Sequence, residues 1–194
     1  MRLLRRPRPP FQILFLTGRS DPRSAALSPV QTAFLDALPA PDGWKVRVNF
    51  PYPAATPPFR ETPLLRASWR NFRQFAGSRR AEFAERHRQP VLDRIEATER
   101  TFVLASSSGL ELLANLRLPA PALARLHVFA YGPVARRVPA CDHRLVQGHR
   151  DWISRAWFRT VETRVACGHL DYLADPEVLR LCSAYLGEAM EKGV

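Results

Sequence analysis

The sequence predicts an α/β protein, a three-layer sandwich built on a mostly parallel sheet of about six strands. Short apolar runs alternate along the chain with longer segments of helical periodicity, and this alternation repeats six times. Such alternation is typical of parallel sheets joined by right-handed crossovers, with helices on both faces. A hydrophobic fraction of 46% over 194 residues can bury a core of this size, and it excludes a disordered chain.

Six short apolar runs are the predicted strands. Each ends at a turn-forming or polar residue, as a buried parallel strand does. The predicted strands cover residues 11–16, 44–50, 101–105, 126–131, 143–147 and 163–167.

One helix start is recognisable from its capping residues. Ser28-Pro29-Val30-Gln31 combines an N-cap serine, a proline at the first helical position and a glutamine that closes a capping box. Val30, Phe34 and Leu38 follow at four-residue spacing and predict the buried face of this helix, which Pro39 ends.

Further helices are expected between and after the strands. They cover residues 62–75, both sides of Pro90 up to residue 99, and the segment from the third strand to Pro119. The last helix begins at Asp175, and we expect its buried face to hold Val178, Cys182, Tyr185 and Leu186.

In parallel sheets of this kind, functional residues gather at the carboxyl ends of the strands. The third predicted strand leads into Ala105-Ser106-Ser107-Ser108-Gly109, which has the small-x-Ser-x-Gly pattern of a nucleophile elbow. A sharp strand-to-helix turn strains the central serine and needs small residues two positions away on either side. Ser107 is therefore the candidate nucleophile, and the backbone N–H of Ser108 is a candidate oxyanion donor. The same letters also fit a serine-rich helix N-cap.

Two later strands are followed by the partners that a serine nucleophile needs. Gly148-His149-Arg150-Asp151 places a carboxylate after the fifth strand, and Gly168-His169-Leu170-Asp171 places an imidazole after the sixth. The chain order Ser107, Asp151, His169 at strand ends is the order of a Ser-His-Asp triad on such a sheet. Each residue also has an ordinary explanation, because Asp151 can cap the next helix and His169 can be a loop residue. Their joint occurrence favours the triad.

Other residues compete for these roles. Asp142 lies before its strand, Glu162 lies in a turn, and Asp171 is only two residues past the histidine, so each fits the carboxylate position less well. Ser106 and Ser108 are the alternative nucleophiles, but the elbow geometry selects the middle serine.

With these motifs, the sequence resembles the α/β-hydrolase superfamily over residues 11–186. Residues 16–24, Leu-Thr-Gly-Arg-Ser-Asp-Pro-Arg-Ser, are similar to the His-Gly-x-x-Ser-x-Pro-x-Ser loop of small, lidless bacterial esterases. The resemblance implies that the N–H of Arg19 is the second oxyanion donor. Thr17 stands where that family usually has His, and Ala105 where it usually has Gly, although neither position performs the chemistry.

The motifs and the resemblance together predict a serine hydrolase that cleaves a carboxylic ester or thioester through an acyl-enzyme, without a cofactor. Ser107 attacks the acyl carbonyl, His169 takes and returns the proton, and Asp151 holds the imidazole. Two other hypotheses stay open. One is a catalytically silent α/β-hydrolase-like protein that binds or scaffolds, and the other is a flavodoxin-like protein that binds a phosphorylated ligand through residues 17–20 and 106–109.

The substrate is less well defined by the sequence. The connection over residues 132–140 is too short to form a lid domain. Four aromatic residues could line an acyl pocket, although such residues are more often the buried face of a helix. They are Trp69, Phe72, Phe75 and Phe83.

Charged and metal-binding residues indicate the class of partner. Arg19, Arg150 and Arg155 lie near the predicted mouth of the site and favour an anionic substrate, although arginine is frequent throughout the chain. No metal is expected, because the remaining histidines lack metal-ligand spacing. They are His87, His127, His143 and His149.

The chain carries 29 Lys and Arg against 18 Asp and Glu, a formal net charge of +11. Because these basic residues are spread along the chain and no nucleic-acid-binding motif accompanies them, we expect a small acyl substrate and no nucleic-acid partner. Residues 1–10 are expected to be a flexible basic tail, followed by a single domain over residues 11–194.

The apolar runs and the cysteines bear on location. No run reaches the length of a membrane span, and residues 11–16 are not followed by a signal-peptide cleavage site. The 3 cysteines lack the CxxC spacing of a zinc site and do not suggest a disulfide framework. A cytoplasmic location is therefore expected.

Overall fold

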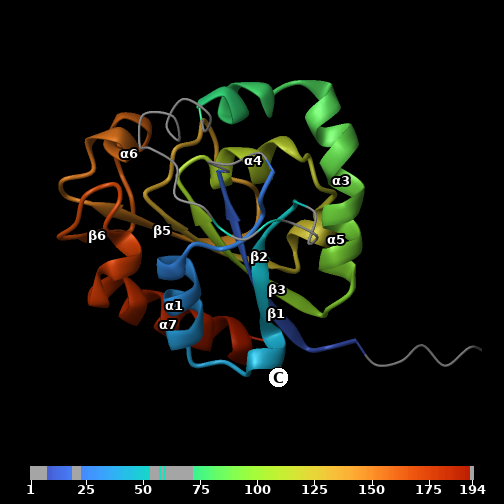
Figure 1. Ribbon diagram of the computed structural model, residues 1–194, viewed down its shortest axis with the longest axis horizontal. Coiled ribbons are helices and arrows are strands. Elements are labelled where there is room, and N and C mark those ends of the chain that lie inside the picture. Colours follow the sequence, from blue (N-terminus) through green and yellow to red (C-terminus); the bar gives the residue numbers. More distant parts are fainter. Residues whose placement is uncertain (1–7, 19–22, 53–56, 58, 60–71, 193–194) are drawn as a thin grey trace, which may run out of the picture.

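A computed structural model describes residues 8–18, 23–52, 57, 59 and 72–192 of the chain. Within these residues, six parallel strands form one sheet in the order β2-β1-β3-β4-β5-β6 (Figure 1). The strands are β1 (Phe11–Thr17), β2 (Lys45–Asn49), β3 (Arg100–Ser106), β4 (Leu126–Tyr131), β5 (Asp142–Gly148) and β6 (Thr163–Val165).

The order of the strands reverses beside β1, which has β2 on one side and β3 on the other. β1 and β3 pair in register up to Thr17 opposite Ser106. The register continues through Ser106 opposite Tyr131 in β4 and Tyr131 opposite Val146 in β5. The residues that follow these strands therefore meet at one edge of the sheet, the edge at which open α/β sheets bind their ligands.

Helices cover both faces of the sheet (Figure 1). One face packs against α1 (Pro29–Ala37) and α7 (Pro176–Glu191), and Phe15, Phe102 and Phe129 belong to its core. The other face packs against α3 (Ala81–Glu96), α4 (Gly109–Asn115) and α5 (Ala120–Leu123), and Leu16 and Val103 belong to its core. Successive side chains alternate between two buried faces, which is why the strands read as continuous apolar runs. The predicted fold class, a three-layer, α/β-hydrolase-like sandwich on a parallel sheet, is confirmed.

Two predicted helix starts are confirmed. The hydroxyl of Ser28 accepts the N–H of Gln31, and the Gln31 side chain accepts the N–H of Ser28 at 2.9 Å, which completes the capping box. Asp175 caps α7 by accepting the N–H of Glu177 at 2.8 Å. The predicted inner face of α7 is buried, as Val178, Cys182, Tyr185 and Leu186 all are.

The prediction that Pro90 divides two helices is wrong, because α3 continues through it. A proline inside a helix leaves the carbonyl four residues earlier, here that of Arg86, without its usual donor. Both residues lie on the exposed side of α3, where water can solvate that carbonyl. Val91 and Ile95 anchor the opposite side of the helix in the core.

Several boundaries differ from those predicted. The 3₁₀ helix η1 (Asp42–Trp44) takes the start of the second predicted strand, and β6 ends two residues early. Val30 is 46% exposed, whereas Phe34 and Leu38 are buried as predicted, and Leu35 joins them on the buried face of α1. The predicted helix over residues 62–75 and the tail over residues 1–10 lie largely outside the described residues. The described chain also holds the short elements α6 (Trp152–Trp157) and η2 (Tyr172–Ala174), and residues 72–77 are helical.

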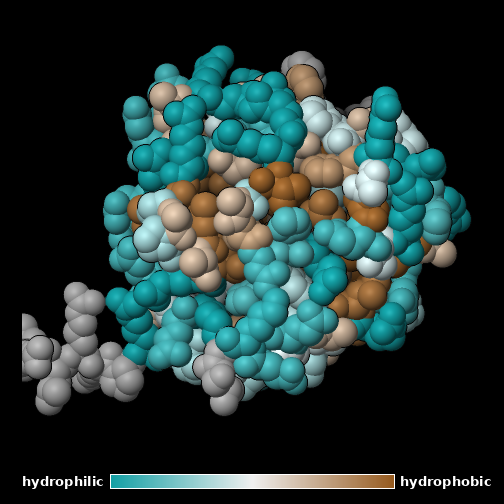
Figure 2. Space-filling model, turned by 180° about the vertical axis from the view of Figure 1, so that it is seen from behind, coloured by the Kyte–Doolittle hydropathy of each residue, from teal (hydrophilic) through white to brown (hydrophobic). Residues whose placement is uncertain are grey.

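The face shown in Figure 2 is mostly hydrophilic at its periphery. On the face shown in Figure 2, apolar side chains gather in a central band that hydrophilic side chains enclose. The large hydrophobic side chains that are exposed in the described residues are Val30, Phe72, Trp152, Trp157 and Leu170. Within the same residues, no helix has the length and hydropathy that crossing a membrane requires.

We expect Gly109→Ala to lower the free energy of unfolding by about 3 kcal/mol or more, because the added methyl group overlaps backbone atoms that cannot move aside. A Cβ atom at Gly109 would lie 1.9 Å from the carbonyl oxygen of Leu16. Gly187 in α7 is the matched control, since a Cβ atom there meets nothing within 4 Å. Gly187→Ala should stabilise by about 0.5–1 kcal/mol. Urea denaturation of both variants tests this, and equal effects would contradict it.

Candidate active site

Ser107 lies where the chain turns sharply from β3 into α4. Its φ of 49° is in the left-handed region, which costs a residue with a side chain about 1–2 kcal/mol. The N–H of Ser107 donates to the carbonyl of Tyr131 at 3.4 Å, and its own carbonyl accepts the N–H of Val134 at 2.9 Å. This is the strained strand-to-helix turn that the sequence predicts at Ser107.

The close packing of α4 on β1 depends on Gly109. The position leaves no room for a side chain, because the backbone of Leu16 approaches it directly. Ala105 is fully buried on the other side of the turn. Ser108 caps α4 without a side-chain hydrogen bond, which removes the interpretation of these serines as an ordinary N-cap. The N–H of Ser108 makes no hydrogen bond to any other described residue.

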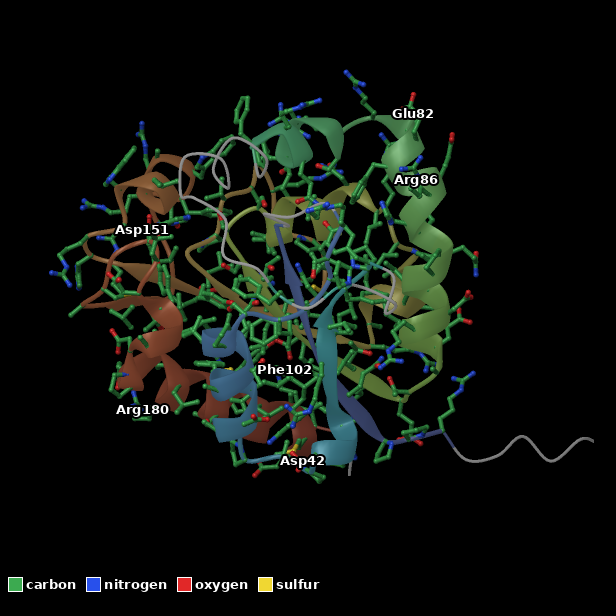
Figure 3. The ribbon with its side chains drawn as sticks, viewed as in Figure 1. Asp42, Glu82, Arg86, Phe102, Asp151 and Arg180 are labelled. Atoms are coloured by element: carbon green, nitrogen blue, oxygen red, sulfur yellow. The ribbon has the colours of Figure 1, made fainter. Side chains whose placement is uncertain are left out.

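His169 connects the serine to a carboxylate. Its Nε2 lies 3.2 Å from the Oγ of Ser107, and its Nδ1 lies 2.9 Å from the Oδ2 of Asp151. The side chain of His169 is 19% exposed, whereas Asp151 is fully buried. Figure 3 shows Asp151 near α6, far from Asp42, which precedes β2 at the bottom of the view. The structure thus brings the three predicted side chains together at the carboxyl edge of the sheet.

The Asp151 carboxyl is held in its ionised form. Burial raises its pKa, but the hydrogen bonds from His169, Tyr172 and the Ser154 N–H more than offset burial and leave the pKa below its ordinary value. An ionised carboxylate only accepts hydrogen bonds, so Nδ1 of His169 carries the proton between them. Nε2 of the neutral ring is then an acceptor for the hydroxyl of Ser107. In this state the imidazole can take a proton from the serine.

Asp151 is also the N-cap of α6. Its Oδ1 accepts the N–H of Ser154 at 2.9 Å, so the helix-capping explanation holds together with the contact to His169. The cap fixes one carboxylate oxygen and leaves the other to face the imidazole.

Two further polar side chains shape the site although they belong to no motif. Tyr172 in η2 is buried and donates to Oδ2 of Asp151 at 2.6 Å. Asn49 closes β2, and its side chain bonds both backbone groups of Thr17, at 3.0 Å to the N–H and 3.2 Å to the carbonyl. Asn49 thereby holds the end of β1, from which the loop at Gly18 departs. The position of Asn49 at the end of a strand, where functional residues gather, could have identified it from the sequence. No sequence pattern around Tyr172 indicates its role.

The alternative residues have other partners. Asp142 bonds Lys192 at 2.6 Å at the start of β5. Glu162 accepts a backbone N–H from β5 at 2.9 Å, and Asp171 accepts an N–H of its own loop at 3.1 Å. Ser106 is the last residue of β3, and its neighbour Ser107 is the serine that contacts the imidazole.

Some predicted site residues lie outside the described residues. These are Arg19, the implied oxyanion donor, and Trp69. Of the other aromatic residues proposed for an acyl pocket, Phe75 is buried against Trp157 of α6, with ring centroids 5.1 Å apart. Phe83 packs against the core, and Phe72 is 60% exposed. Phe75 and Phe83 therefore pack as helix-face residues.

Exposed apolar side chains lie next to Asp151 and His169 in the chain. Trp152 follows Asp151 and is 75% exposed, and Leu170 follows the histidine and is 70% exposed. Arg150 bonds the carbonyl of Ala166, and Arg155 bonds the carbonyl of His149, so two guanidinium groups are held on the α6 side of the site. Within the described chain, no group of His, Cys, Asp and Glu side chains could hold a metal ion.

Comparison with known proteins gives a likeness of fold. No family model and no curated protein matches the chain. Among solved structures, a candidate hydrolase of the alpha/beta superfamily from Xanthomonas campestris pv. campestris is similar over 94% of this chain and 98% of that chain. The sequence identity is 15% and the TM-score is 0.45. At this identity the likeness concerns the fold alone.

The strain at Ser107 predicts a difference between two substitutions. Ser107→Gly should be more stable than Ser107→Ala by about 1 kcal/mol, because only glycine adopts a positive φ without cost. Arg117 also has a positive φ, 51°, and is exposed and outside the site. It is a matched control, because Arg117→Gly should likewise be more stable than Arg117→Ala. Denaturation by urea measures both differences. A Ser107→Gly variant no more stable than Ser107→Ala would show that the turn is not strained.

Proposed function

We propose that this protein is a serine hydrolase of the α/β-hydrolase superfamily that cleaves a carboxylic ester or thioester. Ser107 is the nucleophile, His169 is the general base and acid, and Asp151 orients the imidazole. The proposal rests on one observation above all, the unbroken hydrogen-bonded path from the Ser107 hydroxyl through His169 to a buried, ionised carboxylate.

The proposed reaction has two halves. The Oγ of Ser107 attacks the acyl carbonyl carbon while Nε2 of His169 takes the hydroxyl proton. The tetrahedral intermediate then expels an alcohol or thiol, which receives that proton from His169, and the acyl group stays on Ser107. A water molecule attacks the acyl-enzyme by the same route, releasing the carboxylic acid and restoring the serine. Asp151 stabilises the imidazolium in both halves by accepting its Nδ1–H.

The oxyanion is the second requirement of this chemistry. Ser108 is the N-cap of α4, and its N–H has no partner among the described residues. This N–H is therefore free to bind a developing negative charge. One such donor is typically worth about 3–4 kcal/mol of transition-state stabilisation. The N–H of Arg19 would be the second donor by resemblance to the small esterases, whose loop the residues after β1 resemble.

The surroundings of the relay favour an amphiphilic acyl substrate with negative charge. Trp152 and Leu170 offer apolar surface directly beside the two partners of the serine. Arg150 and Arg155 add positive charge on the same side. The three cysteines are unpaired, which suits a reducing compartment, so we place the protein in the cytoplasm.

A fluorophosphonate probe tests the proposal directly. Wild-type protein should be labelled, and mass spectrometry should locate the label on Ser107. Ser107→Ala should abolish labelling, and His169→Ala should slow it by about a thousandfold or more, because the hydroxyl then lacks its base.

The controls separate the competing hypotheses. Labelling on Ser106 or Ser108 instead would reject the assignment of the nucleophile. If folded wild-type protein takes no label and hydrolyses no ester or thioester, the enzyme hypothesis fails. The catalytically silent binding protein and the flavodoxin-like protein that binds a phosphorylated ligand are then the remaining interpretations.

The arginines predict a charge preference. Of two esters equal in length, one neutral and one ending in a carboxylate, the anionic one should have the higher kcat/KM, by roughly fivefold at low salt. Arg150→Gln combined with Arg155→Gln should remove this preference. Arg180→Gln is the control, because Arg180 lies on α7, well apart from Asp151 in Figure 3. A preference that survives the double substitution would reject this role.

A further inference from the structure

Asp151 meets a buried phenol as well as the imidazole. The hydroxyl of Tyr172 lies 2.6 Å from Oδ2 of Asp151, the same oxygen that His169 approaches. It also lies 2.7 Å from the backbone nitrogen of Gly148. Tyr172 is 2% exposed, so these two contacts replace the water that would otherwise solvate the hydroxyl.

The direction of both hydrogen bonds is fixed by chemistry. A backbone N–H can only donate, so the Tyr172 oxygen accepts a hydrogen bond from Gly148, and its own O–H donates one to Asp151. Oδ2 of Asp151 therefore accepts two hydrogen bonds, from Tyr172 and from His169, while Oδ1 accepts one from the N–H of Ser154. The carboxylate plane is held by contacts on both oxygens.

The backbone around the Tyr172 ring restricts the ring to one position. Gly132 has a φ of 54°, and a Cβ atom there would lie 2.6 Å from Cε2 of Tyr172 and 3.0 Å from Oδ2 of Asp151. The ring of Tyr131 packs against the ring of Tyr172, with their centroids 5.7 Å apart. The ring thus has little freedom to rotate its hydroxyl away from the carboxylate.

We propose that Tyr172 is a positioning residue for the hydrolytic reaction, one that sets both the orientation of the Asp151 carboxylate and the share of its negative charge that reaches His169. This inference deepens the proposed function and rests on it. Tyr172 touches neither substrate nor nucleophile and acts through Asp151 alone.

The expected effect of losing the phenol has a definite sign. The Tyr172 hydrogen bond helps to keep the pKa of Asp151 low against the effect of burial. Without it, Asp151 concentrates its charge on the one remaining side-chain donor, the imidazole, and favours the imidazolium. The ring therefore becomes protonated at higher pH, and the acidic limb of the activity profile moves upward.

Other ionisable groups near this cluster stay the same between the variants. Burial raises the pKa of Cys167 to about 11, so the thiol is neutral over the range of interest. Arg150, Asp171 and Asp175 act on the same thiol from the adjoining segments. Because none of these groups is altered, a shift between variants reports on Tyr172.

Tyr172→Phe is the test, and Tyr131→Phe is its matched control. Both remove one buried hydroxyl from neighbouring rings, but the Tyr131 hydroxyl faces Ser106 and makes no hydrogen bond to Asp151, His169 or Ser107. Tyr172→Phe should lower kcat by about ten- to a hundredfold, change KM less than about twofold, and move the acidic limb of kcat/KM upward by about half a pH unit. Tyr131→Phe should leave all three unchanged.

A second readout does not depend on turnover. In full-length protein, NMR of nitrogen-labelled histidine follows the titration of the His169 ring, assigned with His169→Gln. Tyr172→Phe should raise the midpoint of that titration by about half a pH unit, and Tyr131→Phe should not. If wild-type protein has no hydrolytic activity but the midpoint still shifts, the proposed function fails while the coupling through Asp151 stands. An unchanged midpoint and unchanged kcat would overturn the inference, even if thermal stability falls.

A variant that keeps the hydrogen bond guards against loss of folding. Replacing Tyr172 by 3-fluorotyrosine makes the phenol a stronger donor with almost no change of shape. It should lower the midpoint of the His169 titration, the opposite of the effect of Tyr172→Phe. A midpoint equal to that of wild type would show that the phenol does not set the charge on Asp151.

Discussion

The carboxylate of Asp151 carries a full negative charge with no exposure to water, and the surrounding chain is arranged to supply what water would have supplied. An unpaired buried charge costs several kcal/mol, so each oxygen needs donors held in place. They come from three segments that follow β5 and β6: the first turn of α6, the loop with His169, and η2 with Tyr172. The glycine at 132 leaves the space that the phenol and the carboxylate occupy. The hydrogen bond from His169, which leads to Ser107, is thus one of several contacts that together stabilise the buried charge of Asp151.

A second constraint lies at the other side of the site, where α4 meets β1. The contact between Gly109 and Leu16 draws the helix against the strand, and the connecting residue Ser107 takes up the strain. Tertiary packing holds this strained turn in place, as the hydrogen bonds of Ser107 to the Tyr131 carbonyl and from the Val134 N–H show. The strained turn at Ser107 and the buried carboxylate of Asp151 together bring the Ser107 hydroxyl within hydrogen-bond distance of the His169 imidazole. Neither segment would hold this arrangement alone.

Much of this arrangement could be predicted from sequence, and the failures have physical reasons. The capping box at Ser28 was readable because its partners are three residues apart. The prediction of a helix break at Pro90 is wrong because the carbonyl of Arg86, which loses its donor, lies on the solvent side of α3. Sequence periodicity does not show that water can solvate this carbonyl. The roles of Asn49 and Tyr172 are not evident from local sequence, because their partners are Thr17 and Asp151, which lie on other segments of the chain. Their contacts exist only once the strands are paired.

The sequence by itself determined the class of fold and the candidate residues. Apolar runs of strand length, separated by helical segments, require a parallel sheet, and a parallel sheet brings its carboxyl ends to one edge. Ser107, Asp151 and His169 could therefore be chosen from their positions after strands. The tertiary structure alone decided the distances between them, the ionised state of the buried carboxylate and the share that Tyr172 takes of its charge. Those properties depend on burial and on contacts between residues distant in the sequence, which no local pattern encodes.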